Sequence, residues 1–115
     1  MPTPTYKPFD VVVVPFPFTD SAATKRRPAL VLSTSAFNDR AAHIVLAMIT
    51  SREHLGRPLD AEIRDLAAAG LIHASIVRMK LFTLDERLVL RRAGTLAAPD
   101  RAAVQRSLGL LLPAA

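Results

Sequence analysis

The stretch Phe9-Asp10-Val11-Val12-Val13-Val14-Pro15-Phe16-Pro17-Phe18-Thr19-Asp20, followed after four residues by Lys25-Arg26-Arg27-Pro28-Ala29-Leu30-Val31-Leu32-Ser33, decides the fold. Two apolar segments rich in β-branched residues flank a polar loop, and each is too short for a buried helix or a membrane span. Because Pro28 disfavours helical backbone angles at the residue before it, Arg27 is expected in extended backbone at a strand entrance. A guanidinium held there offers a planar donor fork that suits a phosphate.

The rest of the chain also predicts short strands. They are expected over residues 10–14, 29–33, 43–49, 59–63 and 74–84, with a loop over 15–27 and a basic turn at 91–92. Residues 33–39 have the composition of a turn or a short helix, and residues 67–70 that of a helical turn ended by glycine. A terminal helix is expected over 99–112, with one apolar face formed by Val104, Leu108, Leu111 and Leu112. Short strands followed by one amphipathic helix predict a mainly β fold, a small barrel covered by a helix.

Length, composition and charge limit the classes of function that the chain can have. The 115 residues make one domain, expected over 9–115 after a flexible N-terminal tip at 1–8. The absence of cysteine excludes disulfides, thiolate zinc sites and thiol nucleophiles. With no apolar run near about 18 residues, we expect a cytoplasmic protein. The net charge of +5 favours a polyanionic partner, and a genome-wide bias toward Ala, Arg and Pro is the less favoured explanation of the charge.

The order of these motifs resembles the MazF/PemK family, the ribonuclease half of toxin–antitoxin pairs. The match starts with the strand after Asp10 and the Arg27-Pro28 segment. It continues at Ile49-Thr50-Ser51, Ser75-Ile76-Val77-Arg78, Leu81-Phe82-Thr83-Leu84-Asp85 and Gly94-Thr95-Leu96. The resemblance implies an SH3-like small β-barrel with short helices and a C-terminal amphipathic helix. It also implies metal-independent, sequence-selective cleavage of single-stranded RNA to 2′,3′-cyclic phosphate and 5′-hydroxyl ends, which inhibits translation and growth. The implied partners are a second copy in a homodimer and an acidic antitoxin. The chain would contact DNA only indirectly, as part of its complex with the antitoxin.

The resemblance also implies three catalytic residues. Arg27 would face the scissile phosphate, where its high pKa suits charge stabilisation better than proton removal. Thr50 would hydrogen-bond a phosphate oxygen, and Arg78 matches an arginine that the Kid/PemK branch uses as acid. Without the resemblance, Arg27 reads as a solvated surface arginine and Thr50 as an ordinary strand threonine.

The general base is left open. The Kid/PemK branch carries an aspartate where this chain has Lys80, and the first loop lacks that branch's histidine. The candidates are Asp20, Glu53, His43, His54 and His73, with His54 first because it lies near Thr50 in a polar loop. The scattered histidines show no paired ligand spacing, so no metal or other cofactor is expected.

Several cations and aromatics are candidates for RNA contacts. The RNA-binding set is Lys25, Arg26, Ser51, Arg52 and Lys80, with Arg57 as a further phosphate contact. Phe16 and Phe18 are equally suited to base stacking or to the core, whereas Phe82 is expected in the core.

Two rivals remain. A CcdB-like toxin would bind DNA gyrase and have no nuclease activity, but the tryptophan-containing C-terminus of such chains is absent here. A non-catalytic barrel that only binds nucleic acid or protein is the second rival, favoured by Lys80 in place of the family aspartate.

Overall fold

The computed structural model describes residues 5–15 and 25–114. Its elements, in chain order, are β1 (Asp10–Pro15), β2 (Arg26–Val31), α1 (Ser35–Ala41), β3 (His43–Ser51), η1 (Arg52–His54), β4 (Ala61–Ile63), α2 (Leu66–Ala69), β5 (Ser75–Asp85), η2 (Glu86–Leu88), β6 (Arg91–Thr95) and α3 (Ala98–Leu111).

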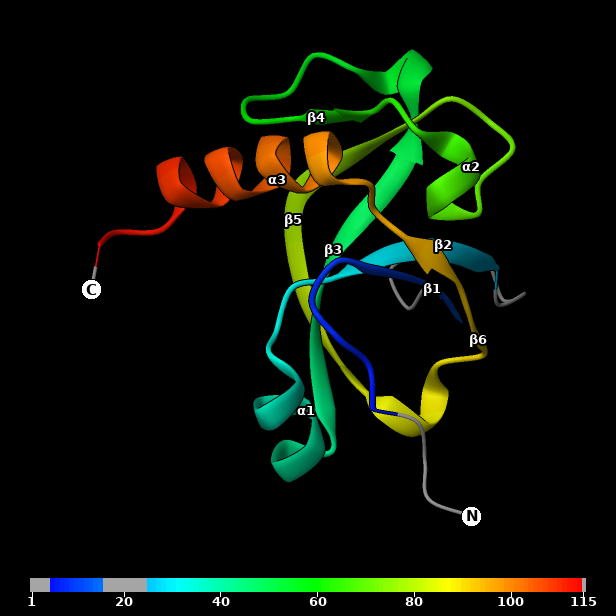
Figure 1. Cartoon of the computed structure of the whole chain (residues 1–115), viewed down its shortest axis with the longest axis vertical. Helices are drawn as coiled ribbons and strands as arrows, with labels where there is room; N and C mark the ends of the chain where they lie inside the picture. The colour runs from blue at the N-terminus through cyan, green and yellow to red at the C-terminus, as the bar shows by residue number, and fades with distance from the viewer. Residues whose placement is uncertain (1–4, 16–24, 115) are drawn as a thin grey trace.

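The six strands form one curled antiparallel sheet in the order β4-β5-β3-β2-β1-β6 (Figure 1). β3 and β5 are its long central pair, and β5 carries two extra residues where Ala47 pairs with Leu81 but Met48 pairs with Arg78. Such a bulge increases the local twist and helps the sheet to curl. β4 and β6 are the two edge strands of the sheet. α2 directly follows β4 in the chain and contacts β6, so it connects the two edges. The predicted mainly β fold, a small barrel with short helices and a C-terminal helix, is confirmed.

Each face of the sheet carries its own apolar cluster because residues alternate along β1 and β2. Val12, Val14, Ala29 and Val31 pack on one face with the far halves of β3 and β5. Val11 and Leu30 pack on the other face, which Val104 of α3 covers. The first face is called the Val12 face below, and the second the Val11 face.

Asp10, the first residue of β1, ties strand ends together rather than facing solvent. Its buried carboxylate accepts hydrogen bonds from the Lys7 N–H and the Thr95 hydroxyl, both 3.0 Å long. Tyr6 is buried just before it, and the Asn38 amide donates to the Tyr6 carbonyl. The expectation of a mobile tip over residues 1–8 therefore does not hold for Tyr6.

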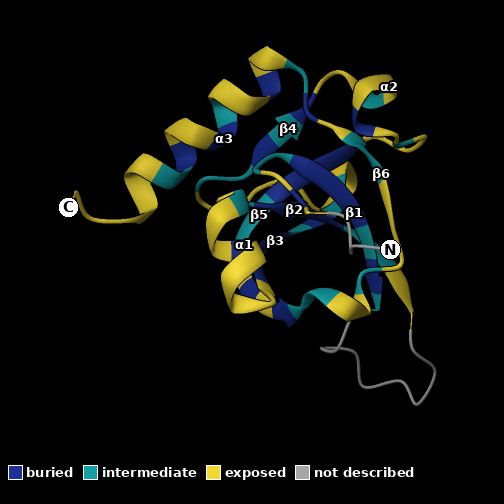
Figure 2. Cartoon of the chain, turned by 60° about the horizontal axis from the view of Figure 1, so that its bottom comes forward, coloured by how far each residue is buried: buried dark blue, intermediate teal, exposed yellow. Residues whose placement is uncertain are grey.

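α3 begins with Pro99 in its first turn and without a side-chain cap, as the sequence suggested. It packs over β4 and β5 through Val104 and Leu108. Its last turns extend away from the sheet, and Figure 2 shows them exposed. Leu111 is 38% exposed and Leu112 52% exposed, whereas Val104 is buried, so the predicted apolar face is only half covered.

Some element boundaries differ from those predicted. Arg91 and Arg92 lie in β6, paired with β1, and not in a turn. β2 starts at Arg26, earlier than predicted, and residues 59–60 precede β4 rather than belonging to it. The short-helix alternative for residues 33–39 is confirmed, because the Thr34 hydroxyl caps α1 by accepting the Phe37 N–H.

Candidate nucleic-acid interface

Arg27 and Thr50 stand on neighbouring strands and on the same face of the sheet. In the pairing of β2 with β3, Ala29 lies opposite Met48. Continuing this register by two residues along each strand sets Arg27 opposite Thr50. Both residues are partly exposed, and directly opposed residues of an antiparallel pair have Cβ atoms about 5 Å apart. A guanidinium and a hydroxyl are therefore brought within reach of a single phosphate group.

Arg78 lies on the same face, one strand further, opposite Met48. Its guanidinium is held by Asp60: Nε donates to Oδ1 over 3.2 Å, and Nη2 to Oδ2 over 3.0 Å. Nη2 also donates to the His54 carbonyl over 2.6 Å. The side chains of Arg78 and Asp60 are only 12% and 2% exposed. Arg78 is thus close to the predicted centre, but its charge is balanced inside the fold.

The electrostatics of this pair keep both groups ionised at neutral pH. Burial opposes the charge on Asp60, but hydrogen bonds from Arg78 and from the Arg57 and Gly56 N–H groups outweigh it and lower the pKa of Asp60. The hydrogen bond to Asp60 in turn raises the pKa of Arg78. A guanidinium that holds its proton more tightly is a poorer proton donor. The pairing therefore argues against the sequence-based assignment of Arg78 as the acid.

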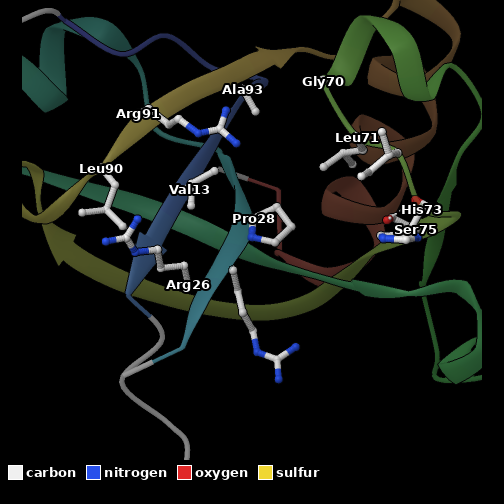
Figure 3. Close-up of a pocket in the computed structure, with 12 residues that line it drawn as sticks. Val13, Arg26, Pro28, Gly70, Leu71, His73, Ser75, Leu90, Arg91 and Ala93 are labelled. Carbon is white, nitrogen blue, oxygen red and sulfur yellow. Dashed lines mark hydrogen bonds between the residues drawn. The ribbon is translucent and has the colours of Figure 1, made fainter. Parts of the chain in front are cut away.

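A groove of about 480 Å³ lies beside β2 and is rich in arginine. Arg26 and Arg91 flank Val13 and Pro28, because Val13 pairs with both Pro28 and Arg91 and Arg26 lies two residues from Pro28. Figure 3 shows His73 at the opposite end of this groove. The described lining residues are Val13, Arg26, Arg27, Pro28, Gly70, Leu71, Ile72, His73, Ser75, Leu90, Arg91 and Ala93. None of these is acidic, so the groove suits an anion.

A close approach of two backbones builds one wall of this groove. A Cβ atom at Gly70 would lie 2.0 Å from the Ala93 carbonyl oxygen of β6. Gly70 also has a φ of 72°, which glycine adopts without strain. The predicted glycine stop of α2 is confirmed, and this stop leads the chain into the segment Leu71 to His73 at the groove.

Among the predicted RNA contacts, Lys25 and Arg26 are exposed at the start of β2, and Arg26 lines the groove. Lys80 is exposed in the bulged part of β5. Arg57 is exposed too, while its backbone N–H donates to Asp60. These four cations come from three different segments, and only Arg26 is placed next to Arg27.

The two remaining predicted RNA contacts, Ser51 and Arg52, already have protein partners. The Ser51 hydroxyl accepts the Glu53 N–H over 3.4 Å and so caps η1. Arg52 Nε lies 2.9 Å from Glu62 Oε1, with both side chains partly exposed. An exposed ion pair of this kind contributes little to stability, so RNA can compete for Arg52.

The candidates for the general base are scattered. His43 contacts the last carbonyl of α1 through Nδ1. His54 is exposed, with Nε2 3.9 Å from Oε1 of Glu53, which is more exposed still. His73 lines the groove together with Arg26 and Arg27, and Asp20 lies outside the described residues. Sequence reasoning ranked His54 first, whereas the groove holds His73.

The predicted aromatic contacts divide in a similar way. Phe82 is buried in the core cluster of the Val12 face, as expected. Phe16 and Phe18 lie outside the described residues. Within residues 5–15 and 25–114, no group of three or more His, Cys, Asp or Glu side chains could hold a metal ion. Over the same ranges, no helix is long and apolar enough to cross a membrane.

Comparison with known families decides what kind of protein this is. A sequence model of the PemK-like, MazF-like toxins of type II toxin–antitoxin systems matches residues 7–112. The chain belongs to this toxin family. No curated protein matches the chain in sequence.

Solved structures agree with the family at the level of the fold. MazF from Deinococcus radiodurans superposes with a TM-score of 0.74 at 24% identity, covering 95% of this chain and 97% of that one. A MazE-MazF structure from the same organism gives 0.74 at 26% identity, with 93% and 95% covered. An endoribonuclease in complex with its cognate antitoxin, from a mycobacterial species, gives 0.74 at 15% identity, with 96% and 99% covered.

The sequence did not indicate where two residues of this PemK/MazF-like toxin lie in the site. Asp60 lies 18 positions before its partner Arg78 in a polar loop, and no local pattern connects them. Arg91 was placed in a turn, but pairing with β1 puts it into the groove. Apolar and polar residues do not alternate over Leu90, Arg91, Arg92 and Ala93, so the sequence signal for the strand that contains Arg91 is weak.

Proposed function

We propose that this toxin is a sequence-selective, metal-independent endoribonuclease. It cleaves single-stranded RNA, mRNA included, to 2′,3′-cyclic phosphate and 5′-hydroxyl ends, and so inhibits translation and growth in the cytoplasm. The observation that carries the proposal is the register of β2 with β3, which brings Arg27 and Thr50 together. The arginine-rich groove, which Arg27 borders, adds a second anion surface at the same strand.

The reaction needs three tasks from the protein. A base takes the proton of the ribose 2′-hydroxyl, the 2′-oxygen attacks phosphorus, and the bond to the 5′-oxygen breaks as that oxygen takes a proton from Arg27 or from water. Arg27 stabilises the charge that develops on the phosphoryl oxygens, and Thr50 donates a hydrogen bond to one of them. His73 lines the groove that Arg27 also borders, but Val13 and Pro28 of that groove lie on the opposite face of the sheet from Thr50, so the base stays open among the candidates from the sequence.

The RNA chain itself would be held by charge. Lys25, Arg26, Arg52 and Lys80 contact phosphates on either side of the cleaved bond, and the Ser51 hydroxyl adds a hydrogen bond. Arg91 joins this set because it lies in the groove with Arg26. Each contact of this kind releases counterions, which makes binding sensitive to salt.

The proposed protein partners are a second copy of the chain and an acidic antitoxin. Leu110, Leu111 and Leu112 are exposed at the end of α3, and burying them in a two-fold interface would remove apolar surface from water. An acidic, disordered segment suits the arginine-rich groove and would exclude RNA from it directly. Structures of related toxins with an antitoxin support this partner.

The test is incubation of the purified chain with single-stranded RNA in EDTA, followed by mapping of the new ends. Cleavage that leaves cyclic phosphate and 5′-hydroxyl ends is the expected result. Intact RNA at micromolar protein, with cleavage restored by a divalent metal, would contradict the metal-independent reaction. Intact RNA under both conditions, together with inhibition of DNA gyrase supercoiling, would favour the CcdB-like rival instead.

A further inference from the structure

Asp60 and Arg78, next to the proposed site, are joined by two hydrogen bonds, and each has further hydrogen-bond partners. The Asp60 carboxylate accepts four hydrogen bonds, two from the guanidinium and two from the N–H groups of Gly56 and Arg57, at 2.9 to 3.2 Å. Arg78 adds its bond to the His54 carbonyl. A two-pronged contact between a guanidinium and a carboxylate fixes orientation as well as distance.

These bonds fasten one segment of backbone, residues 54–60, to β5. The segment is mostly exposed: of its two leucines, Leu55 is 48% exposed and Leu59 is only partly buried, with a φ of 67°. Three of its backbone groups, at His54, Gly56 and Arg57, bond to the Asp60–Arg78 pair. With so little apolar burial in the segment, these polar contacts are the main restraint on its position.

The same segment directly follows the end of β3 that carries Thr50. From Thr50 the chain passes through Ser51 and η1 into residues 54–60. Arg52 is fixed at the start by its N–H bond to the Ala74 carbonyl, 2.9 Å long. Beyond this bond, η1 leads directly into residues 54–60, so movement of the segment would pass to η1 and to the side chain of Arg52 at the end of β3, which are proposed to meet RNA.

We propose that Asp60 and Arg78 are positioning residues that lock segment 54–60 onto β5 and thereby place Thr50, Ser51 and Arg52 for RNA. The inference rests on the proposed nuclease function, and it gives Arg78 a different task from the acid that the family resemblance implies. The pair acts as one unit, so removing either partner has the same consequence.

The test compares Asp60→Asn, Arg78→Met and the double variant with the unchanged chain. We expect kcat/KM for RNA to fall by on the order of 10- to 100-fold through a higher KM, while kcat stays near that of the unchanged chain. The double variant should be no worse than either single one, because both remove one shared contact. Arg78→Lys, which keeps the charge but not the fork, should lie between.

A second readout follows the segment itself and needs no RNA. Trypsin should cut after Arg52, in the η1 turn that leads into the segment, faster in each variant than in the unchanged chain, since cleavage requires this part of the chain to open. The matched control is Asp85→Asn, which removes an exposed ion pair, Asp85 Oδ2 to Arg87 Nη2 at 2.8 Å, at the far end of β5. This control should leave both KM and the trypsin rate unchanged.

The possible results distinguish the positioning role of Asp60 and Arg78 from the proposed nuclease function. If Arg78→Met lowers kcat by about 100-fold or more while Asp60→Asn keeps normal kinetics, Arg78 touches the RNA and the positioning role is wrong. An unchanged trypsin rate in all variants, Arg78→Lys included, would also overturn it. If the unchanged chain cleaves no RNA but Asp60→Asn still frees the segment, the nuclease proposal fails and the locking of the segment stands.

Discussion

At the scale of the residue, single carboxylates hold distant parts of this toxin together. Asp10 joins the start of β1 to Thr95 at the end of β6, and Asp60 joins a loop to Arg78. A third, Asp100 of α3, is buried and accepts the N–H groups of Arg64 and Asp65. Such bonds to ionised acceptors are stronger than neutral ones, and breaking one leaves a buried partner unsatisfied.

The ionisation of Asp60 predicts an acid-sensitive fold. Its pKa in the folded chain lies below the ordinary value of about 3.9, so its contribution to stability is complete above that value and is lost as the pH falls through the folded pKa. We expect Asp60→Asn to lower Tm near neutral pH and to make the further loss of Tm between about pH 4 and pH 2 shallower.

Thermal unfolding across this pH range measures the effect. Asp39→Asn, an exposed position on α1, is the matched control and should follow the unchanged chain. Parallel curves for Asp60→Asn and the unchanged chain would mean that Asp60 does not link folding to pH.

At the scale of the element, the contact of α2 with β6 closes the curled sheet. A Cβ atom at Gly94 would lie 2.3 Å from the Ala68 carbonyl oxygen, and one at Gly70 would clash with Ala93. Backbones this close leave room only for glycine. The contact also fixes one wall of the arginine-rich groove, because Gly70 and Ala93 both line it.

Substitution of Gly94 tests this contact. Gly94→Ala should destabilise the chain by about 1–3 kcal/mol, because the added methyl group meets backbone that cannot move aside alone. Gly109→Ala is the matched control: a Cβ atom there meets nothing within 4 Å, and alanine favours the helix, so stability should rise by up to about 1 kcal/mol. Chemical denaturation measures both, and equal stability of the two variants would contradict the close approach.

Elements and site residues were predictable where the signal is local. Val11 to Val14 marks β1, and Gly70 marks the end of α2, because β-branching and a left-handed φ are properties of the residues themselves. Arg91 was misplaced because its strand is defined by β1, which lies far earlier in the chain. Asp60 was missed because only the folded chain brings it to Arg78. Arg27 and Thr50 could be found through the family motif, but their opposition depends on the pairing of β2 with β3.

At the scale of the whole molecule, one groove brings together three arginines and no acidic residue among its described lining residues. The chain carries a net charge of +5, and Arg26, Arg27 and Arg91 line the groove together. Exposed leucines gather at a different place, the end of α3. The molecule thus offers an anion surface and an apolar surface that are separate, so the proposed RNA and the proposed second copy would not compete for one surface.

The charge of the groove predicts a specific salt dependence. Removing Lys25 and Arg26 together should flatten the plot of log affinity for single-stranded RNA against log salt, by about 0.7 for each phosphate that is no longer neutralised. Arg101→Ala with Arg106→Ala removes the same charge from exposed positions on α3 and is the control. An equal change in slope for both double variants would mean that RNA responds only to net charge.

The exposed leucines predict a dimer. Light scattering at micromolar concentration should give twice the chain mass of 12.5 kDa, and Leu110→Lys should return it to the mass of a single chain. Ile72→Lys alters an even more exposed apolar residue, 90% exposed at the groove, and should leave the dimer intact. A mass of 12.5 kDa for the unchanged chain at every concentration would refute the dimer.

The most direct test of the account is the cleavage rate of Arg27→Ala on single-stranded RNA in EDTA, measured in a single turnover beside the unchanged chain. Removing one charge-stabilising contact from the transition state should slow cleavage by on the order of 100-fold or more, with Tm unchanged. Arg27→Lys should also fail, because one point charge does not replace a two-pronged contact. A cleavage rate for Arg27→Ala equal to that of the unchanged chain would contradict the placement of the reacting phosphate between Arg27 and Thr50.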